Sequence, residues 1–394
     1  MHATVITKIA RTLLIAPMAL VAACASVPRG EAAPTPAFAI AAPVGFSPNV
    51  RSLGFERRIA GDAPELNVVR LRAAADDGGL DILALSGGGA NGAFAAGFLV
   101  ELGARGARPQ YEVVTGVSAG ALIAPFAFLG PDWDLELREA FLGGASEGLL
   151  RSRGLGVLFW PGVNSGEPLR GLVDTIVTDA MIEAVARESA RGRILLVATT
   201  DLDRQEPVLW DLGAIAAQGG DAAKALFRDV LVASASVPGL FPPVIIEISA
   251  AGEHYDEMHV DGGATTPFFF APAIAYFDSD AIEGLAGANV FVLISGPLRA
   301  PTRTTPQATI PILSRSFSTL MMHMTRTAIA ATSAYAVRQS MSFHLAAMPP
   351  ETAEEDWLDF RHDHLASVFA IGAREAADER PWLGAEEALA AAAP

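Results

Sequence analysis

Short apolar runs and helical stretches alternate along the middle of the chain. An apolar run at 81–85 leads through a glycine-rich turn into a helical stretch at 90–102, and a run at 112–115 leads through a similar turn into a helical stretch at 119–128. Apolar runs of this length are typical of strands buried on both faces, and strand–helix alternation predicts an α/β protein with a parallel sheet. Further strands are expected at 194–198, 244–248 and 290–294.

Three other stretches carry weaker signals. Residues 133–191 have loose helical periodicity interrupted by glycines, which favours an insertion that covers a site on the sheet. Residues 310–348, rich in Met, Ala and Ser, are expected to form a long helical stretch. The aromatic run at 267–270 is expected to lie in the core, although an acyl-chain pocket needs apolar lining of the same kind.

The composition is that of a globular protein, because 51% of the 394 residues are hydrophobic and only 18% are charged. A single large domain is expected. The formal net charge is −16, which excludes nucleic acid as an expected partner because nucleic-acid binding relies on basic surfaces. The seven histidines are scattered without the His-Glu-x-x-His spacing, so neither a metal nor another cofactor is expected.

The N-terminus resembles a bacterial lipoprotein signal. Two basic residues precede an apolar run at 13–23 that is too short to span a bilayer core of about 30 Å. Cys24, the only cysteine, follows directly, where a lipobox places the residue that becomes diacylated. The alternative is an ordinary secretory signal cut near Ala23. The lipoprotein interpretation predicts anchoring in the bacterial cell envelope, and Ala25 favours the outer membrane over the inner one.

Composition also divides the chain into segments. The Ala- and Pro-rich stretch after the cysteine is typical of a tether, and the alternation at 66–71 suggests an edge strand or a brace. The expected segments are a signal peptide at 1–23, a lipidated tether at 24–50, an N-terminal brace at 51–79, a main domain at 80–375 and a C-terminal tail at 376–394.

The turn after the second strand, Gly116-Val117-Ser118-Ala119-Gly120, is a Gly-x-Ser-x-Gly nucleophile elbow. Glycines on both sides of the serine allow a tight strand-to-helix turn that pushes the hydroxyl out of the backbone. Ser118 is therefore a candidate nucleophile for acyl transfer.

The turn after the first strand, Gly87 to Gly92, offers backbone N–H groups to an oxygen that becomes negative in a transition state. Its Gly-x-Gly-x-x-Gly spacing also matches a dinucleotide-binding fingerprint. In a dinucleotide-binding unit the next strand ends in an acidic residue that binds ribose. Here the next strand runs into the elbow at Ser118, so an oxyanion loop is favoured.

A third motif, Asp261-Gly262-Gly263, lies far downstream, after a stretch at 233–243 that reads Ala-Ser-Ala-Ser-Val-Pro-Gly-Leu-Phe-Pro-Pro. With these motifs the chain resembles the patatin-like phospholipase family over about residues 80–374. The resemblance implies a three-layer patatin-like fold, with a mostly parallel central sheet flanked by helices, and it identifies 80–375 as the catalytic domain. It also implies a serine lipid acyl hydrolase that releases fatty acids from membrane lipids.

The resemblance assigns roles to individual residues. Ser118 is the nucleophile and Asp261 is the base, in a Ser–Asp dyad without histidine. Asn91 stands where the family has a basic residue in the glycine-rich loop, so this chain lacks the charge beside the loop that would help to bind a phospholipid phosphate. The implied oxyanion hole consists of Gly87, Gly88, Gly89 and Ala119, and the motif-supporting glycines are Gly92, Gly116, Gly120, Gly262 and Gly263.

Other interpretations stay open. A Ser-His-Asp triad of the α/β-hydrolase type would combine Ser118 and Asp261 with a histidine downstream. His259, two residues before Asp261, could form a hydrogen bond in the site or be an exposed strand residue. A lipid-binding lipoprotein of the same fold could lack turnover, and acyl transfer or thioester hydrolysis would use the same dyad. The candidate triad histidines are His323, His344, His362 and His364.

Overall fold

The computed structural model describes residues 29–393, except 39, 54–78, 147, 151–164, 271–285, 301, 303 and 353–356. The expected signal peptide, Cys24 and the alternating stretch at 66–71 therefore lie outside the described residues.

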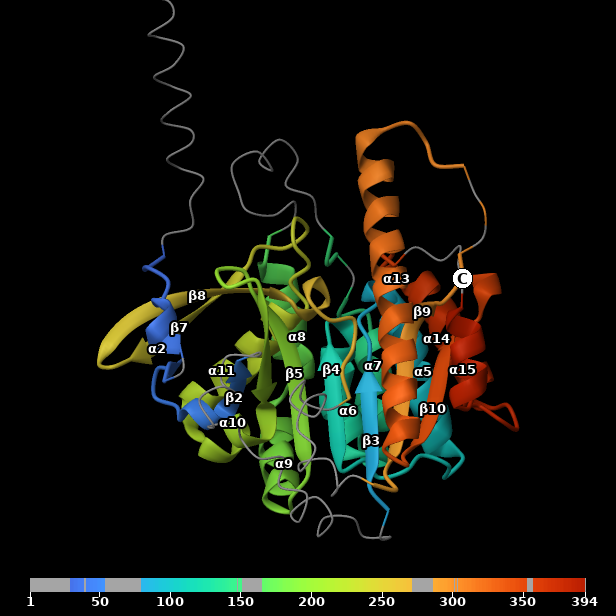
Figure 1. The fold of residues 1–394 in the computed structure, drawn as a ribbon, viewed down its shortest axis with the longest axis horizontal. Helices are drawn as coiled ribbons and strands as arrows, with labels where there is room; N and C mark the ends of the chain where they lie inside the picture. Colours follow the sequence, from blue (N-terminus) through green and yellow to red (C-terminus); the bar gives the residue numbers. More distant parts are fainter. Residues whose placement is uncertain are drawn as a thin grey trace, which may run out of the picture.

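Ten strands of the described chain form one sheet (Figure 1). Eight of these strands follow the order β1-β7-β8-β5-β4-β3-β9-β10. The other two extend the sheet from β5, because β6 pairs with β5 and β2 pairs with β6. The strands are β1 Ala42–Pro43, β2 Arg51–Leu53, β3 Asp81–Leu85, β4 Val113–Val117, β5 Ile194–Asp201, β6 Glu206–Asp211, β7 Val244–Ala250, β8 Glu253–Asp261, β9 Asn289–Pro297 and β10 Ser342–Met348.

The centre of the sheet is parallel, and the end that contains the N-terminal strands is antiparallel. Strands β5, β4, β3, β9 and β10 pair in parallel, whereas β8, β7 and β1 continue the path in antiparallel fashion. Helices cover both faces. The structure thus confirms the predicted α/β fold with a mostly parallel central sheet flanked by helices.

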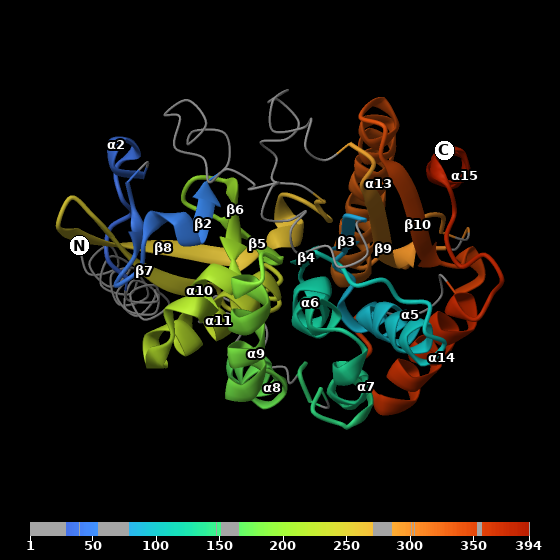
Figure 2. The ribbon, with the colours of Figure 1, turned by 90° about the horizontal axis from the view of Figure 1, so that it is seen from below.

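The helices form two layers around the sheet (Figure 2). Helices α13 and α15 cover one face, and the helices from α5 to α11 together with α14 cover the other. The helices are α2 Thr35–Phe38, α5 Gly92–Ala104, α6 Ala119–Leu129, α7 Asp134–Leu142, α8 Glu167–Ile176, α9 Asp179–Ala190, α10 Leu212–Gln218, α11 Gly220–Ser234, α13 Thr309–Arg338, α14 His362–Ala376 and α15 Ala385–Ala392.

Strand β3 shows how the apolar runs build both cores. Successive side chains of a strand point to opposite faces. Leu83 and Leu85 pack into the larger core, while Ile82 and Ala84 pack into the core under α13 and α15. All five residues of β3 are buried, as expected for a strand covered on both sides. The aromatic run also lies in the cores, with Phe268 and Phe270 on the α13 side.

The five strands expected from the apolar runs are present, but the long helical prediction at 310–348 is wrong at its end. Helix α13 stops at Arg338, Ser340 adopts a left-handed φ of 58°, and the chain continues as β10. Strand β10 pairs in parallel with β9 along its whole length. In a short apolar segment, the pattern of side chains does not distinguish a strand from a continuing helix. The pairing with β9 therefore decides the conformation of this segment.

The two ends of the described chain are parts of the fold rather than a tether and a tail. Within the expected tether, Phe38 and Val50 are buried, and β1 pairs with β7. Within the expected tail, Leu383 forms a bridge with Leu345, and α15 buries Ala388 against α13 and β10. Both segments are rich in small apolar residues, which suit close packing. A flexible linker can have the same composition, so composition alone did not predict that these segments are packed.

Among the described helices, none combines the length and the apolar character that crossing a bilayer requires.

Candidate active site

The nucleophile elbow adopts a strained backbone conformation. Ser118 lies between the end of β4 and the start of α6, with φ 56° and ψ −124°. The glycines around it are required because backbone atoms pack closely against them. A Cβ on Gly116 would lie 2.6 Å from the Gly120 carbonyl oxygen, and a Cβ on Gly120 would lie 2.6 Å from the Leu85 carbonyl oxygen. The Gly-x-Ser-x-Gly spacing is therefore explained by packing as well as by the turn.

Asp261 reaches Ser118 because two strands meet end to end. Strand β6 pairs with one edge of β5 from Leu196 to Asp201, so β4 and β8, which pair with parts of the same stretch, share the other edge. Strand β4 runs parallel to β5 up to Ala198, and β8 runs antiparallel to it up to Thr199. The carboxyl ends of β4 and β8 thus face each other, and Ser118 Oγ donates a hydrogen bond of 2.6 Å to Asp261 Oδ2.

Burial makes Asp261 an unusually basic carboxylate. Only 4% of the residue is exposed, and burial raises its pKa to about 7, against the opposing effect of hydrogen bonds from Ser118 and from the Gly263 N–H. The Gly263 N–H donates to Asp261 Oδ1 at 2.7 Å, which leaves Oδ2 directed at the serine. A carboxyl group with a pKa near neutrality is suited to accept and return a proton.

The glycine-rich loop after β3 lies over Ser118. Gly89 has φ +58°, and a Cβ there would collide with the Trp357 carbonyl oxygen, whereas a Cβ on Gly88 would collide with the Ser295 carbonyl oxygen. The Gly87 N–H donates to the Pro267 carbonyl at 3.2 Å, so it is not available to an oxyanion in this conformation.

The remaining candidate donors are the N–H groups of Gly88, Gly89 and Ala119. Gly88 and Gly89 belong to the tight turn before α5, and Ala119 is the first residue of α6. The first N–H groups of a helix have no partner within the helix. All three groups lie near Ser118, because Gly88 and Gly89 line one cavity together with Ser118 and Ala119 follows Ser118 directly in the chain.

The other motif glycines also permit close packing. A Cβ on Gly92 would lie 2.8 Å from the Ala119 Cβ, and a Cβ on Gly262 would collide with the Ala198 carbonyl. A Cβ on Gly263 would lie 3.0 Å from Asp261 Oδ1. These glycines bring the loop, the elbow and the aspartate within contact distance of one another.

Sequence analysis missed the role of Ser234. This residue ends α11, and its Oγ accepts a hydrogen bond from the Ser118 N–H at 3.0 Å while donating to the Ala198 carbonyl at 2.7 Å. It therefore ties the strained elbow to β5. The only signal in the sequence was its place in the 233–243 stretch, where Ser236 instead donates to the Val232 carbonyl at the helix end.

Two cavities meet at Ser118. The larger, of about 810 Å³, lies under α13 and also contains Asp261, Asn91 and Trp357. The smaller, of about 60 Å³, extends toward α6, α7 and α8 and is lined almost entirely by apolar side chains, which include Leu122, Leu149, Leu169, Leu172, Leu240 and Phe241. The expected insertion at 133–191 thus contributes to the site through the described parts of α7 and α8.

The histidines of the alternative triad lie elsewhere. None of His323, His344, His362 and His364 lines either cavity at Ser118, and the hydrogen bonds of the Asp261 carboxylate are to Ser118 and Gly263. His344 instead stacks on Phe291, with ring centroids 4.5 Å apart. The arrangement at Ser118 therefore does not form a Ser-His-Asp triad. Within the described ranges, no cluster of three or more His, Cys, Asp or Glu side chains could hold a metal ion.

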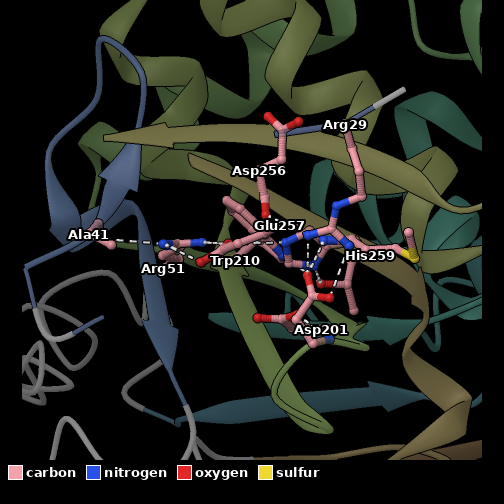
Figure 3. A network of polar contacts seen from close by, with 11 residues as sticks. Arg29, Ala41, Arg51, Asp201, Trp210, Asp256, Glu257 and His259 are labelled. Carbon is pink, nitrogen blue, oxygen red and sulfur yellow. Dashed lines mark hydrogen bonds and ion pairs between the residues drawn. The ribbon is translucent and has the colours of Figure 1, made fainter. Parts of the chain in front are cut away.

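His259 is fully buried in a polar network beside the site (Figure 3). Trp210 Nε1 donates to Thr199 Oγ1 at 2.8 Å, Thr199 Oγ1 lies 2.9 Å from His259 Nδ1, and His259 Nε2 lies 3.2 Å from Glu257 Oε2. Glu257 in turn forms a buried ion pair with Arg51. Thr199 also pairs with Asp261 across the sheet, so the network supports the strand that carries the aspartate.

The charge of Glu257 is stabilised within this network. Burial alone would raise its pKa, but the hydrogen bond from His259 and the positive charge of Arg51 lower it to about 2. Arg51 comes from β2 and also donates to the Ala41 carbonyl at 3.2 Å. The N-terminal segment is thus linked through side chains to β8.

Comparison with known protein families gives a match over the residues that form the candidate site. The model of the family described as patatin-like phospholipase matches residues 83–274, a range that contains the glycine-rich loop, the elbow and the Asp261 motif. No curated protein sequence matches the chain significantly.

Two solved structures are similar at low sequence identity. VipD from Legionella pneumophila is 14% identical, and the match covers 82% of this chain and 70% of VipD with a TM-score of 0.33. Human GIVD cytosolic phospholipase A2 is 12% identical, and the match covers 78% of this chain and 53% of the human protein with a TM-score of 0.28. The chain thus matches about half of the human protein's length.

Proposed function

We propose that this chain, whose residues 83–274 match the family model described as patatin-like phospholipase, is a lipid acyl hydrolase with a Ser118–Asp261 dyad. The family match supports a lipid-hydrolysing enzyme. The observation that carries the finer assignment is the 2.6 Å hydrogen bond from Ser118 Oγ to the buried Asp261 carboxylate, at the junction of two cavities.

The first half of the reaction forms an acyl-enzyme. Ser118 Oγ attacks the ester carbonyl carbon while its proton moves to Asp261 Oδ2, and the carbonyl oxygen becomes negative beside the N–H groups of Gly88, Gly89 and Ala119. When the tetrahedral intermediate collapses, the ester C–O bond breaks and Asp261 returns the proton to the departing alcohol oxygen.

The second half regenerates the enzyme. A water molecule attacks the acyl-serine carbonyl, Asp261 accepts one of its protons, and the proton returns to Ser118 Oγ as the fatty acid leaves. An acceptor other than water would make the same intermediate a transferase intermediate, so the identity of the products decides between hydrolysis and transfer.

The cavities support a glycerolipid as substrate. The small cavity beside Ser118 is lined almost entirely by apolar side chains and suits the first carbons of an acyl chain. The larger cavity has room for the rest of the lipid, and its lining mixes Met321, Met322 and Phe317 with the polar side chains of Asn91 and Arg315. We propose a phospholipid or another membrane glycerolipid.

The proposed location is the bacterial cell envelope, with Cys24 lipidated. The support is in the sequence: a single cysteine directly follows a short apolar run with basic residues before it. The membrane would then hold both the enzyme and its substrate.

The test is substitution of each dyad residue, with substrate hydrolysis and covalent labelling as readouts. Ser118→Ala and Asp261→Asn should each lower the turnover of short-chain esters and phospholipids by several orders of magnitude, because the two groups act as one unit. A fluorophosphonate should label the wild-type protein and not Ser118→Ala, and mass analysis of the products should identify a free fatty acid.

Two matched variants control for structural damage. Asp201→Asn removes another buried carboxylate on the neighbouring strand, and Ser189→Ala removes another buried serine, and neither residue lines the cavities. Both should keep most of the activity. Wild-type protein that is neither labelled nor active would instead indicate a lipid-binding protein without turnover, and activity in Ser118→Ala would overturn the assignment.

A further inference from the structure

Helix α13 extends beyond the body of the molecule at the mouth of the active-site cavity. It is the longest described helix, and Figure 1 shows its N-terminal half projecting past the carboxyl ends of β3 and β4. The helix therefore presents a surface next to the entrance that a substrate must pass.

The two faces of this projecting half have different neighbours. At about 100° per residue, side chains three and four positions apart share a face. One face lines the large cavity with Ser314, Phe317, Ser318, Met321, Met322 and Thr325. The opposite face borders a shallow surface groove with Ile312, Ser316, Leu320 and His323, and Thr319 borders both the groove and the large cavity.

The outer side of the projecting half exposes large apolar side chains. Ile312, Leu313 and Leu320 are 48%, 60% and 57% exposed. They lie within about two and a half turns of one helix, beside the cavity that contains Ser118. Exposed apolar side chains that cluster near an active site indicate an interaction surface.

The charge of this region is opposite to that of the whole chain. The chain has 44 acidic residues and a net charge of −16, yet no Asp or Glu occurs between Glu283 and Glu351. The same stretch contains five arginines and no lysine. Arg315 lies on the projecting half itself and lines both the cavity and the outer groove.

We propose that the projecting half of α13, residues 309–323, docks on an anionic lipid surface, with Ile312, Leu313 and Leu320 entering the headgroup region. Helices that lie in a membrane interface combine apolar side chains with basic residues and few acidic ones. Because residues 284–350 contain no carboxylate side chain, the helix itself adds nothing to the repulsion that this acidic protein meets at anionic headgroups.

This inference rests on the proposed function in one respect. If the chain hydrolyses lipids, docking serves to deliver the lipid to Ser118. Docking would place the open side of the large cavity against the bilayer. Phe317 on the inner face of the helix stacks on Trp357, with ring centroids 5.6 Å apart, and the Trp357 carbonyl accepts the Ala90 N–H of the glycine-rich loop at 2.8 Å. The docking helix and the proposed oxyanion loop are thus joined through one residue.

The test measures vesicle binding of the chain from Ala25 onward, which contains every described residue but neither the signal peptide nor the anchor cysteine. The variant Ile312→Ser/Leu313→Ser/Leu320→Ser should lower its partition onto phosphatidylglycerol-containing vesicles by about tenfold or more, because three apolar side chains are lost from the contact. Hydrolysis of lipid in those vesicles should fall in parallel. The rate on a soluble short-chain ester and the melting temperature should stay close to those of the unsubstituted chain.

Val337→Ser is the matched control. Val337 is 60% exposed on the same helix, about 36 Å from Leu313 along its axis. Its substitution should leave vesicle binding unchanged. Pure phosphatidylcholine vesicles should bind the unsubstituted chain more weakly, and binding to anionic vesicles should weaken when the salt rises from about 0.1 M to about 1 M, which shortens the Debye length from about 10 Å to about 3 Å.

Several outcomes would overturn the proposal. One is equal vesicle binding by the triple variant and the unsubstituted chain. Another is a fall in melting temperature without a change in binding, which would mean that another part of this chain covers the three side chains. A third is loss of a dimer, which would identify a second copy as the partner. Ser118→Ala separates the two hypotheses, because it should bind vesicles normally whether or not the chain hydrolyses lipids.

Discussion

Ser118 combines a strained backbone with a buried acidic partner. A non-glycine residue at φ 56° costs on the order of 1–3 kcal/mol, and such conformations persist only where their surroundings hold them. Here the hydrogen bond from the Ser118 N–H to Ser234 and the pair with Asp261 hold the residue from two sides. The geometry that exposes the hydroxyl to a substrate is thus built into the fold before a substrate binds.

The raised pKa of Asp261 predicts how activity depends on pH. The base must be ionised to accept the serine proton, so kcat/KM should increase as the pH rises through about 7, the pKa that burial gives Asp261. A pH–rate profile with a soluble ester measures this. A profile that is flat between about pH 5 and about pH 8 would contradict the assignment of Asp261 as the base.

The same shift has a consequence for stability. Because burial raises the pKa above its unfolded value, the folded state binds more protons in the interval between the two values, and this contribution to stability is lost as the pH rises through about 7. Asp261→Asn removes the ionisable group. Its free energy of unfolding relative to the wild type should therefore increase between about pH 5 and about pH 8, by on the order of a few kcal/mol, in urea titrations.

At the scale of elements, the N-terminal segment, residues 29–53, packs into the same sheet that carries Ser118 and Asp261. Strand β2 pairs with β6, β1 pairs with β7, and Arg51 joins the segment to Glu257 on β8, two strand positions before His259. Both members of this ion pair are almost fully buried. Burying either charge without the other would cost several kcal/mol, so each side chain stabilises the charge of its partner.

Arg51→Met should lower the free energy of unfolding by about 3–5 kcal/mol, because it leaves the Glu257 carboxylate buried without its cation. The double variant Arg51→Met/Glu257→Gln should recover part of this loss. Arg380→Met, which breaks an exposed ion pair with Glu387, is the control and should change stability by about 1 kcal/mol or less. If Arg51→Met is as mild as the control in urea titrations, the buried pair does not hold the segment.

At the scale of the whole molecule, the packed N-terminal segment shortens the proposed link to the membrane. Arg29 is already fixed, because its guanidinium donates to Asp203 at 2.7 and 2.9 Å and to the Asp256 carbonyl at 3.0 Å. Only residues 25–28 separate it from Cys24, a length of at most about 18 Å from Cys24 to Arg29 when extended. In Figure 1 the described chain begins at the upper left, on the side toward which α13 also projects.

The lipid anchor is tested by Cys24→Ser. The variant should be released from the membrane or stay unprocessed, because the thiol that accepts the acyl chains is gone, while hydrolysis of soluble short-chain esters persists. Fractionation of cell envelopes and mass analysis of the N-terminus measure the two effects. If the processed variant fractionates with membranes as the wild type does, the lipoprotein prediction fails and another surface, such as α13, must account for the membrane binding.

Local backbone requirements were readable from the sequence alone. Apolar runs identified β3, β4, β5, β7 and β9. The signal is clearest for β3 and β4, which are buried throughout, because a strand covered on both faces needs apolar residues along its whole length. The spacing of glycines around Ser118 and in the loop after β3 identified both turns, because only glycine tolerates the contacts made there. Asp261 was recognised from its motif, but its contact with the serine was not visible in the sequence.

Tertiary structure decided what depends on distant partners. Ser118 and Asp261 are 143 positions apart, and they meet because β4 and β8 share one edge of β5. The support from Ser234, the strand character of β10 and the packing of the N-terminal segment also follow from such pairings. Each of these segments is short and has several locally acceptable conformations, so the one adopted is selected by the burial and hydrogen bonds that only the assembled sheet provides.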